Sequence, residues 1–440
     1  MKQKDVFWFW LPLFTSWLLM TAEGPIISAA INRLPEEVVM LAAQGIVLTL
    51  SVTIQSPMIN MLATATALVK DRPSFLIVRN FTLVVLVLLT TITILIGYTP
   101  VFEMVVVQWL GTPVEVAEWV RPGMQIMVFW SAAIGWRRFL QGVLIHFNFP
   151  KQVAWGTTTR LIAVSSMLLT LIFLTDLPGA IIGAISLITA VSIEALYATW
   201  AVRPLFKTVL SKTAPIADGP PLTYWGLFKF HAPLAGSAVL VLLMQPLVTF
   251  TISRLDQPTL NLAAWPVIFQ IILLARAGAL AYPEAVIALS QKENSQAPIR
   301  KFAFNMALVL TGLTVLFIFT PAVNFYLFQI QDVTEGVANL VQASMPYFII
   351  FPALNVINFW LRGIFIFERR TTLVNMGMTV NIAITAVILF IGLQFKWPSL
   401  PTAAIALNIA MICEIGILAV KYVTTESYEK ERLNLSILTK

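Results

Sequence analysis

The sequence predicts an all-α polytopic membrane protein with about twelve transmembrane helices, arranged as two parallel six-helix lobes. Of the 440 residues, 58% are hydrophobic and only 11% are charged, a balance far from that of a soluble domain. Apolar runs recur along the whole chain, and most approach the roughly 20 residues that a helix needs to cross a hydrocarbon core. The second half of the chain also repeats features of the first, which predicts the two lobes.

Each expected span is an apolar run bounded by polar, charged or proline-containing segments. In chain order the spans are residues 7–31, 38–69, 75–98, 122–147, 153–175, 178–201, 227–252, 259–289, 302–320, 340–367, 373–394 and 401–423. Two more apolar segments, from Val101 to Trp119 and near Phe325, are interrupted by polar residues. We expect these two to be interfacial helices rather than spans.

Lysine and arginine are unequally divided between the two sides of this topology. With an even number of spans both termini share one side, which carries about nineteen of these residues under the positive-inside rule. The other side has only Arg33, Arg121, Arg254 and Lys396. This bias predicts a multi-pass protein of the cell (inner) membrane with both termini cytoplasmic. The net charge of +7 follows mostly from it, so we expect contact with membrane lipids and no nucleic-acid partner.

An internal repeat becomes visible when the chain is compared with itself in the register that sets Pro25 against Pro246. Gly24 to Leu34 then aligns with Gln245 to Leu255, and both segments end in Arg-Leu. Other pairs in this register, which we call repeat mates, are Arg79 with Arg300, Thr99-Pro100 with Thr320-Pro321, Gln108 with Gln329, Gly142 with Gly363 and, after a one-residue slip, Glu194 with Glu414. Matched arginine, proline, glutamine and glycine at one spacing indicate a duplication.

Because the repeat contains six spans, an even number, both halves enter the membrane from the same side and are parallel repeats. Such halves enclose a cavity and expose it alternately to either face of the membrane. We expect an N-terminal lobe at 1–202, a cytoplasmic linker at 203–226 that is rich in proline and lysine, a C-terminal lobe at 227–423 and a cytoplasmic tail at 424–440.

The segments Arg137-Arg-Phe-Leu-Gln-Gly142 and Leu361-Arg-Gly363 close the fourth and tenth spans. With two six-helix lobes, they look like the multidrug and polysaccharide (MOP) exporter superfamily, which includes MATE transporters and lipid flippases. Six further segments point to one branch of this superfamily, namely Phe9-Trp-Leu-Pro-Leu13, Met40-Leu-Ala42, Ser56-Pro-Met58, Lys70-Asp-Arg72, Gln245-Pro-Leu-Val248 and Ile299 to Leu308. Through these segments the chain resembles the progressive ankylosis protein family. The resemblance implies a MATE-like fold and export of small anionic metabolites of the citrate, nucleotide or pyrophosphate class.

Charged side chains inside the expected spans are the residue-level evidence for a substrate, since each is costly in lipid unless it faces a cavity or a partner. The basic ones concentrate in the cytoplasmic half, where an anion arriving from the cytosol meets them first. Arginine also suits the capture of carboxylate or phosphate. We therefore predict a substrate site formed by Arg276, Gln55, Asn60, Arg138, Arg137 and Arg362.

Arg276 is the strongest candidate in this set, because it lies well inside its span and its repeat mate, Gln55, is also polar. Pro57 and Gly278 loosen the two helices at the same depth. For Arg137, Arg160 and Arg362 an alternative stays open, namely that their side chains reach the lipid headgroups at the inner ends of the spans.

Glu23, in the outer half of the first span, is the candidate for coupling transport to a proton or another cation, because burial disfavours a charged carboxylate. A structural role, either in an ion pair with an arginine or as a cap on an unwound stretch near Gly24-Pro25, is an equal alternative. Glu194 and Glu414 occupy equivalent repeat positions and are predicted to be structural, with Arg160 as the expected partner in the first lobe.

Other function classes find less support. We predict no enzymatic activity, because no catalytic constellation stands out, and no phosphate-binding glycine-rich loop is present. The lone cysteine, Cys413, and two histidines without matched ligands predict neither a metal site nor a cofactor. A channel, a flippase for lipid-linked precursors and a cation- or proton-coupled multidrug exporter stay open as alternatives to the anion exporter.

Overall fold

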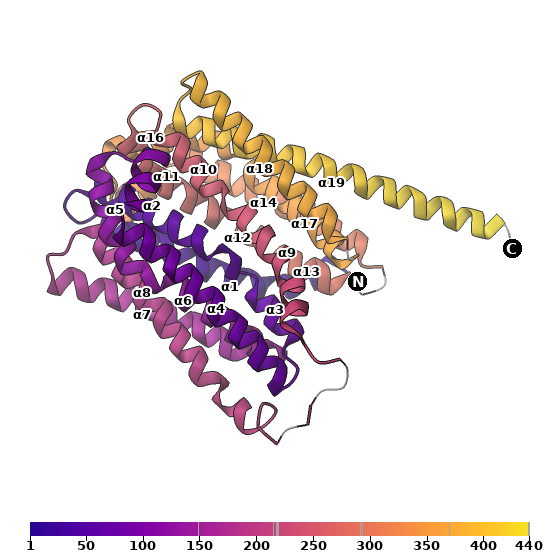
Figure 1. Ribbon diagram of the computed structural model, residues 1–440. Helices are drawn as coiled ribbons and strands as arrows, with labels where there is room; N and C mark the ends of the chain where they lie inside the picture. Colours follow the sequence, from indigo (N-terminus) through magenta and orange to yellow (C-terminus); the bar gives the residue numbers. More distant parts are fainter. Residues whose placement is uncertain are drawn as a thin grey trace. The chain divides into compact units, whose positions relative to one another are not determined.

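The computed structural model describes residues 1–147, 149–213, 215–216, 220–290, 292, 294–368 and 370–438. Every regular element within these residues is a helix (Figure 1). Arg369 and Lys440, two of the basic residues expected on the cytoplasmic side, lie outside the described residues. So do residues 214 and 217–219 of the expected linker.

Ten helices of the described chain are long and apolar enough to cross a membrane. They are Gln3–Ile31, Glu37–Leu68, Arg72–Tyr98, Lys151–Leu174, Gly179–Lys207, Tyr224–Ile252, Pro258–Ala275, Gln296–Phe319, Thr371–Gln394 and Ser399–Thr424. The pair Glu335–Phe348 and Phe351–Phe367, bent by 47°, makes eleven if it counts as one span. These ranges confirm the predicted polytopic all-α fold.

The fourth expected span, residues 122–147, is helical but not apolar enough to join this group. It consists of α5 (Val114–Ile126), the 3₁₀ turn η3 (Met127–Phe129) and α6 (Trp130–His146). Two adjacent arginines, Arg137 and Arg138, lie within α6 and lower its mean hydropathy.

The remaining elements of the first half follow the predicted order. They are α1 (Gln3–Ile31), α2 (Glu37–Gln55), η1 (Ser56–Met58), α3 (Met61–Leu68), α4 (Arg72–Tyr98), η2 (Glu103–Trp109), α7 (Pro150–Leu174), α8 (Gly179–Val202) and η4 (Arg203–Lys207). Asp71 begins α4 with a capping box, since its side chain accepts from the Ser74 amide at 2.9 Å.

The second half has the same order of elements, but its first helix is divided into two, α9 and α10, where the first half has the continuous α1. Its elements are α9 (Tyr224–Leu242), α10 (Met244–Ile252), α11 (Pro258–Ala275), α12 (Ala277–Leu280), α13 (Tyr282–Leu289), α14 (Gln296–Phe319), α15 (Ala322–Asn324), η5 (Phe325–Ile330), α16 (Glu335–Ser344), η6 (Met345–Phe348), α17 (Phe351–Phe367), α18 (Thr371–Gln394) and α19 (Ser399–Leu438). Both η2 and η5, the segments expected to be interfacial helices, are short π-helices.

The contacts divide the chain into two compact units that do not follow the sequence halves. Unit 1 contains Met1–Ala22, Val267–Gln329 and Asn339–Lys440, and unit 2 contains Glu23–Pro266 and Ile330–Ala338. The division cuts α1, α11, η5 and α16, and it places α9 and α10 with most of the first half of the chain. Each unit therefore contains segments from both repeats.

The core of unit 2 packs α3, α4, α6 and α8 around buried aromatic and sulfur-containing side chains. Phe75 and Phe139 lie 5.3 Å apart between ring centroids, beside the fully buried Met58 and Met61. A Cβ at Gly142 would lie 2.4 Å from the Leu62 carbonyl oxygen, so this glycine allows α6 to approach α3.

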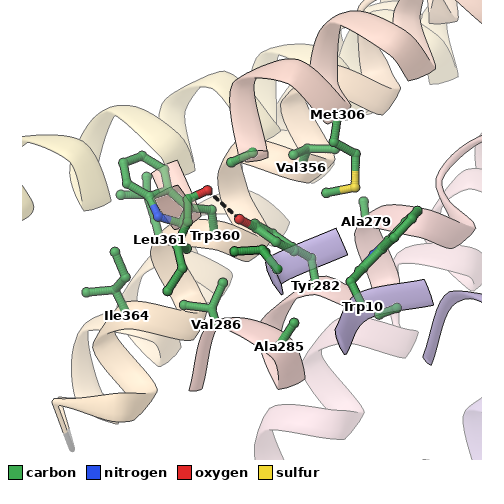
Figure 2. Packing of buried hydrophobic residues seen from close by; sticks show 14 of the residues in the cluster. Trp10, Ala279, Tyr282, Ala285, Val286, Met306, Val356, Trp360, Leu361 and Ile364 are labelled. Carbon is green, nitrogen blue, oxygen red and sulfur yellow. Dashed lines mark hydrogen bonds between the residues drawn. The ribbon is translucent and has the colours of Figure 1, made fainter. Parts of the chain in front are cut away.

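The core of unit 1 includes the beginning of α1. Figure 2 shows Trp10 beside Ala279 and Tyr282, together with the side chains of Met306 and Leu361. The dashed line marks the hydrogen bond that the Tyr282 hydroxyl donates to the Ile299 carbonyl, at 2.6 Å. A Cβ at Gly363, the repeat mate of Gly142, would lie 2.8 Å from Val286 Cβ on α13. Matched glycines thus serve matched helix contacts in the two units.

Candidate functional site: buried arginines and carboxylates

Glu194 on α8 is the centre of the polar cluster in unit 2. Its carboxylate accepts from Arg137 Nη1 at 2.6 Å and from Gln141 Nε2 at 3.2 Å, two side chains one turn apart on α6. Only 5% of the Arg137 side chain and 1% of the Glu194 side chain are exposed. Removing one partner of such a buried pair costs about 3–5 kcal/mol, so this contact stabilises the α6–α8 packing.

Arg160 on α7 connects the same cluster to α1. Its Nε donates to Glu23 Oε1 at 3.0 Å and its Nη2 donates to Glu23 Oε2, a two-point contact, while its Nη1 lies 3.8 Å from Glu194. The structure therefore places Glu23, the candidate for ion coupling, in an ion pair with the arginine that Glu194 also attracts.

Glu414 on α19 is the centre of the corresponding cluster in unit 1. It accepts from Arg362 Nε on α17 at 2.8 Å, from Arg362 Nη2, and from Asn381 Nδ2 on α18 at 2.8 Å. None of the Glu414 side chain is exposed. Glu194 and Glu414 thus lie in equivalent buried positions, each held by side chains from two neighbouring helices.

The register of the repeat relates the partners of the two carboxylates as well. Gln141 corresponds to Arg362, Arg160 to Asn381 and Arg137 to Asn358, whose Nδ2 is buried without a hydrogen-bond partner. Sequence reasoning missed Gln141, Asn381 and Asn358, although each is the repeat mate of a predicted arginine. Aligning all buried polar positions, rather than charges alone, would have found them.

Arg138 is the arginine of unit 2 that this cluster leaves uncompensated. Arg137, Arg138 and Arg160 face two carboxylates, Glu23 and Glu194, and both carboxylates are engaged by the other two arginines. Within the described residues no carboxylate lies within ion-pair distance of Arg138, and its Nε is buried without a hydrogen-bond partner. The positive charge of Arg138 therefore has no carboxylate partner among the described residues.

Arg276 of unit 1 likewise has no carboxylate within ion-pair distance among the described residues. Its one side-chain hydrogen bond is a long one, from Nη1 to Asn355 Oδ1 at 3.4 Å, and its Nε is buried without a partner. The rings of Phe269 and Phe351 lie 5.8 and 5.9 Å from its guanidinium carbon. Aromatic faces stabilise a cation without neutralising it, so the charge stays available.

The helix carrying Arg276 is broken at this residue, as is the equivalent helix at Gln55. Arg276 separates α11 from α12, and Gln55 ends α2 where the 3₁₀ turn η1 begins. Gln55 is 6% exposed, and its Oε1 is buried without a hydrogen-bond partner. Both predicted side chains therefore lie at helix interruptions of the kind that place binding groups within the membrane.

Carbonyl groups next to both breaks accept hydrogen bonds from repeat-related side chains. Trp10 Nε1 donates to the Gly278 carbonyl at 2.8 Å within unit 1, and His231 Nε2 lies 3.1 Å from the Pro57 carbonyl within unit 2. Trp10 and His231 are themselves repeat mates, as are Pro57 and Gly278. The first helix of each repeat thus contacts the broken second helix of the other.

Asn60, the remaining predicted substrate residue, has a protein partner. Its Nδ2 donates to the Leu234 carbonyl on α9 at 2.7 Å, near the contact of Thr64 with His231 Nδ1 at 2.8 Å. The structure thus places Asn60 in the packing of α9. Within the described residues no group of three or more histidine, cysteine or acidic side chains could hold a metal ion.

No protein-family model matches the chain, and no curated protein matches it by sequence. Solved structures match it along nearly its whole length. A multidrug resistance MATE family transporter of the MOP superfamily, in an inward-facing conformation, is 12% identical with a TM-score of 0.71, covering 94% of this chain and 96% of that one.

Two further matches represent other functions on the same fold. The lipid II flippase MurJ, in an inward closed conformation, is 14% identical with a TM-score of 0.70, covering 93% of this chain and 87% of that one. A MOP superfamily transporter from Pyrococcus furiosus, described as having a binding pocket of reverse polarity, is 12% identical with a TM-score of 0.66, covering 100% and 97%. The chain therefore has a MATE-like fold.

Proposed function

We propose that this protein is a secondary transporter that works by alternating access and exports small anionic metabolites. The observation that carries the proposal is the pair of uncompensated guanidinium groups, Arg138 in unit 2 and Arg276 in unit 1. A partly buried cation without a carboxylate partner is expensive within a membrane, and an anionic substrate would supply the missing charge. The MATE-like fold, which hosts transporters, supports the same conclusion.

The chemistry of these residues favours carboxylate or phosphate groups. A guanidinium presents several N–H donors in one plane and binds such groups at two points, whereas cationic drugs would be repelled. Citrate, nucleotides and pyrophosphate compounds have this chemistry, and the resemblance to the progressive ankylosis protein family suggests the same class. The Pyrococcus furiosus transporter, named for a pocket of reverse polarity, supports the idea that pocket charge varies on this fold.

The predicted residues take different parts in this proposal. Within unit 2 the proposed substrate contacts are Arg138 and Gln55, and within unit 1 the proposed contact is Arg276, because each has a buried polar atom without a partner among the described residues. Arg137 and Arg362 contribute positive potential from within their ion pairs, and Asn60 holds the neighbouring helix. Glu23 couples transport to a proton or another cation through its contact with Arg160.

The protein lies in the cell (inner) membrane with both termini in the cytoplasm, as the distribution of lysine and arginine indicates. The two repeats, residues 1–202 and 227–423, are joined by a cytoplasmic linker at 203–226, and residues from 424 onward form a cytoplasmic tail. A transporter of this kind needs no cofactor and catalyses no covalent reaction.

Ligand-induced thermal stabilisation of the purified protein tests the substrate class. Citrate, ATP and pyrophosphate are compared with a cationic dye and with a lipid-linked sugar precursor. A ligand at about 100 times its Kd stabilises the folded state by about 2.7 kcal/mol, which a melting curve resolves. We expect stabilisation by at least one small anion, and we expect Arg276→Ala to abolish it.

The matched control is Arg300→Ala, which removes an exposed arginine of the same charge. It should melt with the same anion-induced shift as the unmodified protein. An anion-induced shift that survives in Arg276→Ala would contradict the assigned role of this residue.

A flippase for lipid-linked precursors is the second candidate function, because the lipid II flippase shares the fold with a TM-score of 0.70. A phosphate-containing lipid headgroup would use the same arginines. Stabilisation by the lipid-linked precursor, with no response to the soluble anions, would favour this candidate over the metabolite exporter.

A further inference from the structure

The first helix of each repeat ends in the same backbone geometry and on the same residue type. Arg33 follows α1 and Arg254 follows α10, with a left-handed residue three positions later in each case, Glu36 at φ 56° and Gln257 at φ 51°. The two arginines are repeat mates. The repeat therefore preserves the way in which this side chain is presented at the end of the helix.

Each of these arginines donates to the end of a π-helix that belongs to the other repeat. Arg33 Nη2 donates to the Ile330 carbonyl at the end of η5, at 3.0 Å, and Arg254 Nη2 donates to the Gln108 carbonyl near the end of η2, at 2.8 Å. Both contacts lie within unit 2. The two accepting carbonyls are almost repeat mates, because the mate of Gln108 is Gln329, one residue before Ile330.

A residue with a positive φ angle follows each π-helix and lies next to the arginine that contacts it. Gly111, at φ 70°, lies under Arg254, where a Cβ would come within 3.0 Å of Nη1. The equivalent position is Asp332, at φ 53°, whose carboxylate lies 3.9 Å from Arg33 Nε. One repeat thus leaves room for the guanidinium, and the other faces it with a charge.

The Arg33 contact attaches a segment of the second repeat to unit 2. Ile330–Ala338 belongs to unit 2, although the residues on both sides of it along the chain belong to unit 1. Asn32 strengthens this attachment, because its Nδ2 donates to the Gln331 carbonyl at 2.9 Å.

We propose that Arg33 and Arg254 form the outer gate of the transporter, closed when each binds the π-helix of the opposite repeat. This inference rests on the proposed transport function and on cytoplasmic termini, which place the end of α1 at the outer face. Exposure suits a contact that must open, since 46% of the Arg33 side chain and 57% of that of Asp332 are exposed. Such pairs bind weakly, unlike the buried Arg137–Glu194 pair.

The test measures access from outside to a cysteine just behind the gate. In a Cys413→Ser background, Ser28→Cys introduces a thiol on α1 at a site that is 3% exposed. A membrane-impermeant maleimide is added outside intact cells, and the labelling rate is measured. Arg33→Ala with Arg254→Ala should raise the rate about tenfold or more, since each loses a charged hydrogen bond.

The matched control is Arg121→Ala. Arg121 is also expected at the outer face, but it pairs with Glu103 of its own repeat at 2.6 Å, so its loss should leave the labelling rate unchanged. Arg33→Lys with Arg254→Lys retains both cations and should label at nearly the original rate. If the double alanine protein does not assemble, the single variants should each raise the rate by a smaller factor.

An unchanged rate in the alanine variants, or an equal rise in Arg121→Ala, would overturn the gate. Labelling needs no substrate, so a failure of the proposed anion transport would not affect this result. Conversely, a protein that binds anions but labels at the same rate in all variants would retain the proposed function and lose the gate.

Discussion

At the scale of single residues, the two repeats both have a buried carboxylate, but different residues bind it. Glu194 and Glu414 are both buried and both bound by two side chains from neighbouring helices. The positively charged partners occupy different positions of the repeat, with arginine at 137 and 160 in the first repeat and at 362 in the second. A buried carboxylate needs a cation near it, but several positions around it can supply one.

The surplus cations follow from this rearrangement. The cluster around Glu194 has one arginine more than it needs, Arg138, and Arg276 stands next to aromatic rings rather than a carboxylate. Sequence alone identified these residues as buried charges. It could not separate the paired Arg137 and Arg362 from the uncompensated Arg138 and Arg276, because pairing depends on helices far apart in the chain.

Glu23→Gln tests ion coupling at this scale. We expect the anion transport of the unmodified protein to change with pH, and that of Glu23→Gln to be independent of pH, because glutamine cannot release a proton. The assay measures initial rates over a pH series, with Glu103→Gln as the control for loss of an exposed paired carboxylate.

A pH profile of Glu23→Gln that matches the unmodified protein would remove the coupling role. A fall in melting temperature with an unchanged profile would instead leave Glu23 as a structural partner of Arg160.

At the scale of helices, the sequence predicted existence and order well. The spans around Leu86, Leu168 and Leu389 agree with the predicted ranges, because a long apolar run in a membrane has few alternatives to a helix. The loosening expected from Pro57 and Gly278 agrees with the interruptions that follow Gln55 and α11. The π-helices at Glu103–Trp109 and Phe325–Ile330 were not predicted, because they depend on contacts that periodicity does not encode.

Helix contacts through matched glycines give the prediction for this scale. Gly142→Ala and Gly363→Ala should each destabilise the protein by about 1–3 kcal/mol, because the added Cβ meets a backbone carbonyl or a valine side chain. The measurement is the melting temperature of the purified protein.

Gly312→Ala is the control, because a Cβ there meets no atom within 4 Å and alanine favours a helix. If Gly142→Ala melted like Gly312→Ala, the close contact of α6 with α3 would not contribute to stability.

At the scale of the whole molecule, the repeat is visible in interactions as well as in sequence. Trp10 and His231 contact equivalent carbonyls, and Arg33 and Arg254 contact equivalent π-helices, always from one repeat to the other. The sequence predicted the duplication and the MATE-like fold, and the solved structures confirm that fold. The exchange of first helices could not be predicted, because a hydropathy pattern does not specify which helix packs against which.

The central claim, carriage of a small anion, is tested most directly by counterflow in proteoliposomes. Vesicles are loaded with the unlabelled anion that stabilises the protein, or with citrate if none does, and uptake of the same labelled anion is followed. A carrier predicts saturable uptake that the internal anion accelerates and that Arg276→Ala abolishes. Uptake that rises linearly with concentration and ignores the internal anion would indicate a channel, and no uptake above empty vesicles would contradict anion transport.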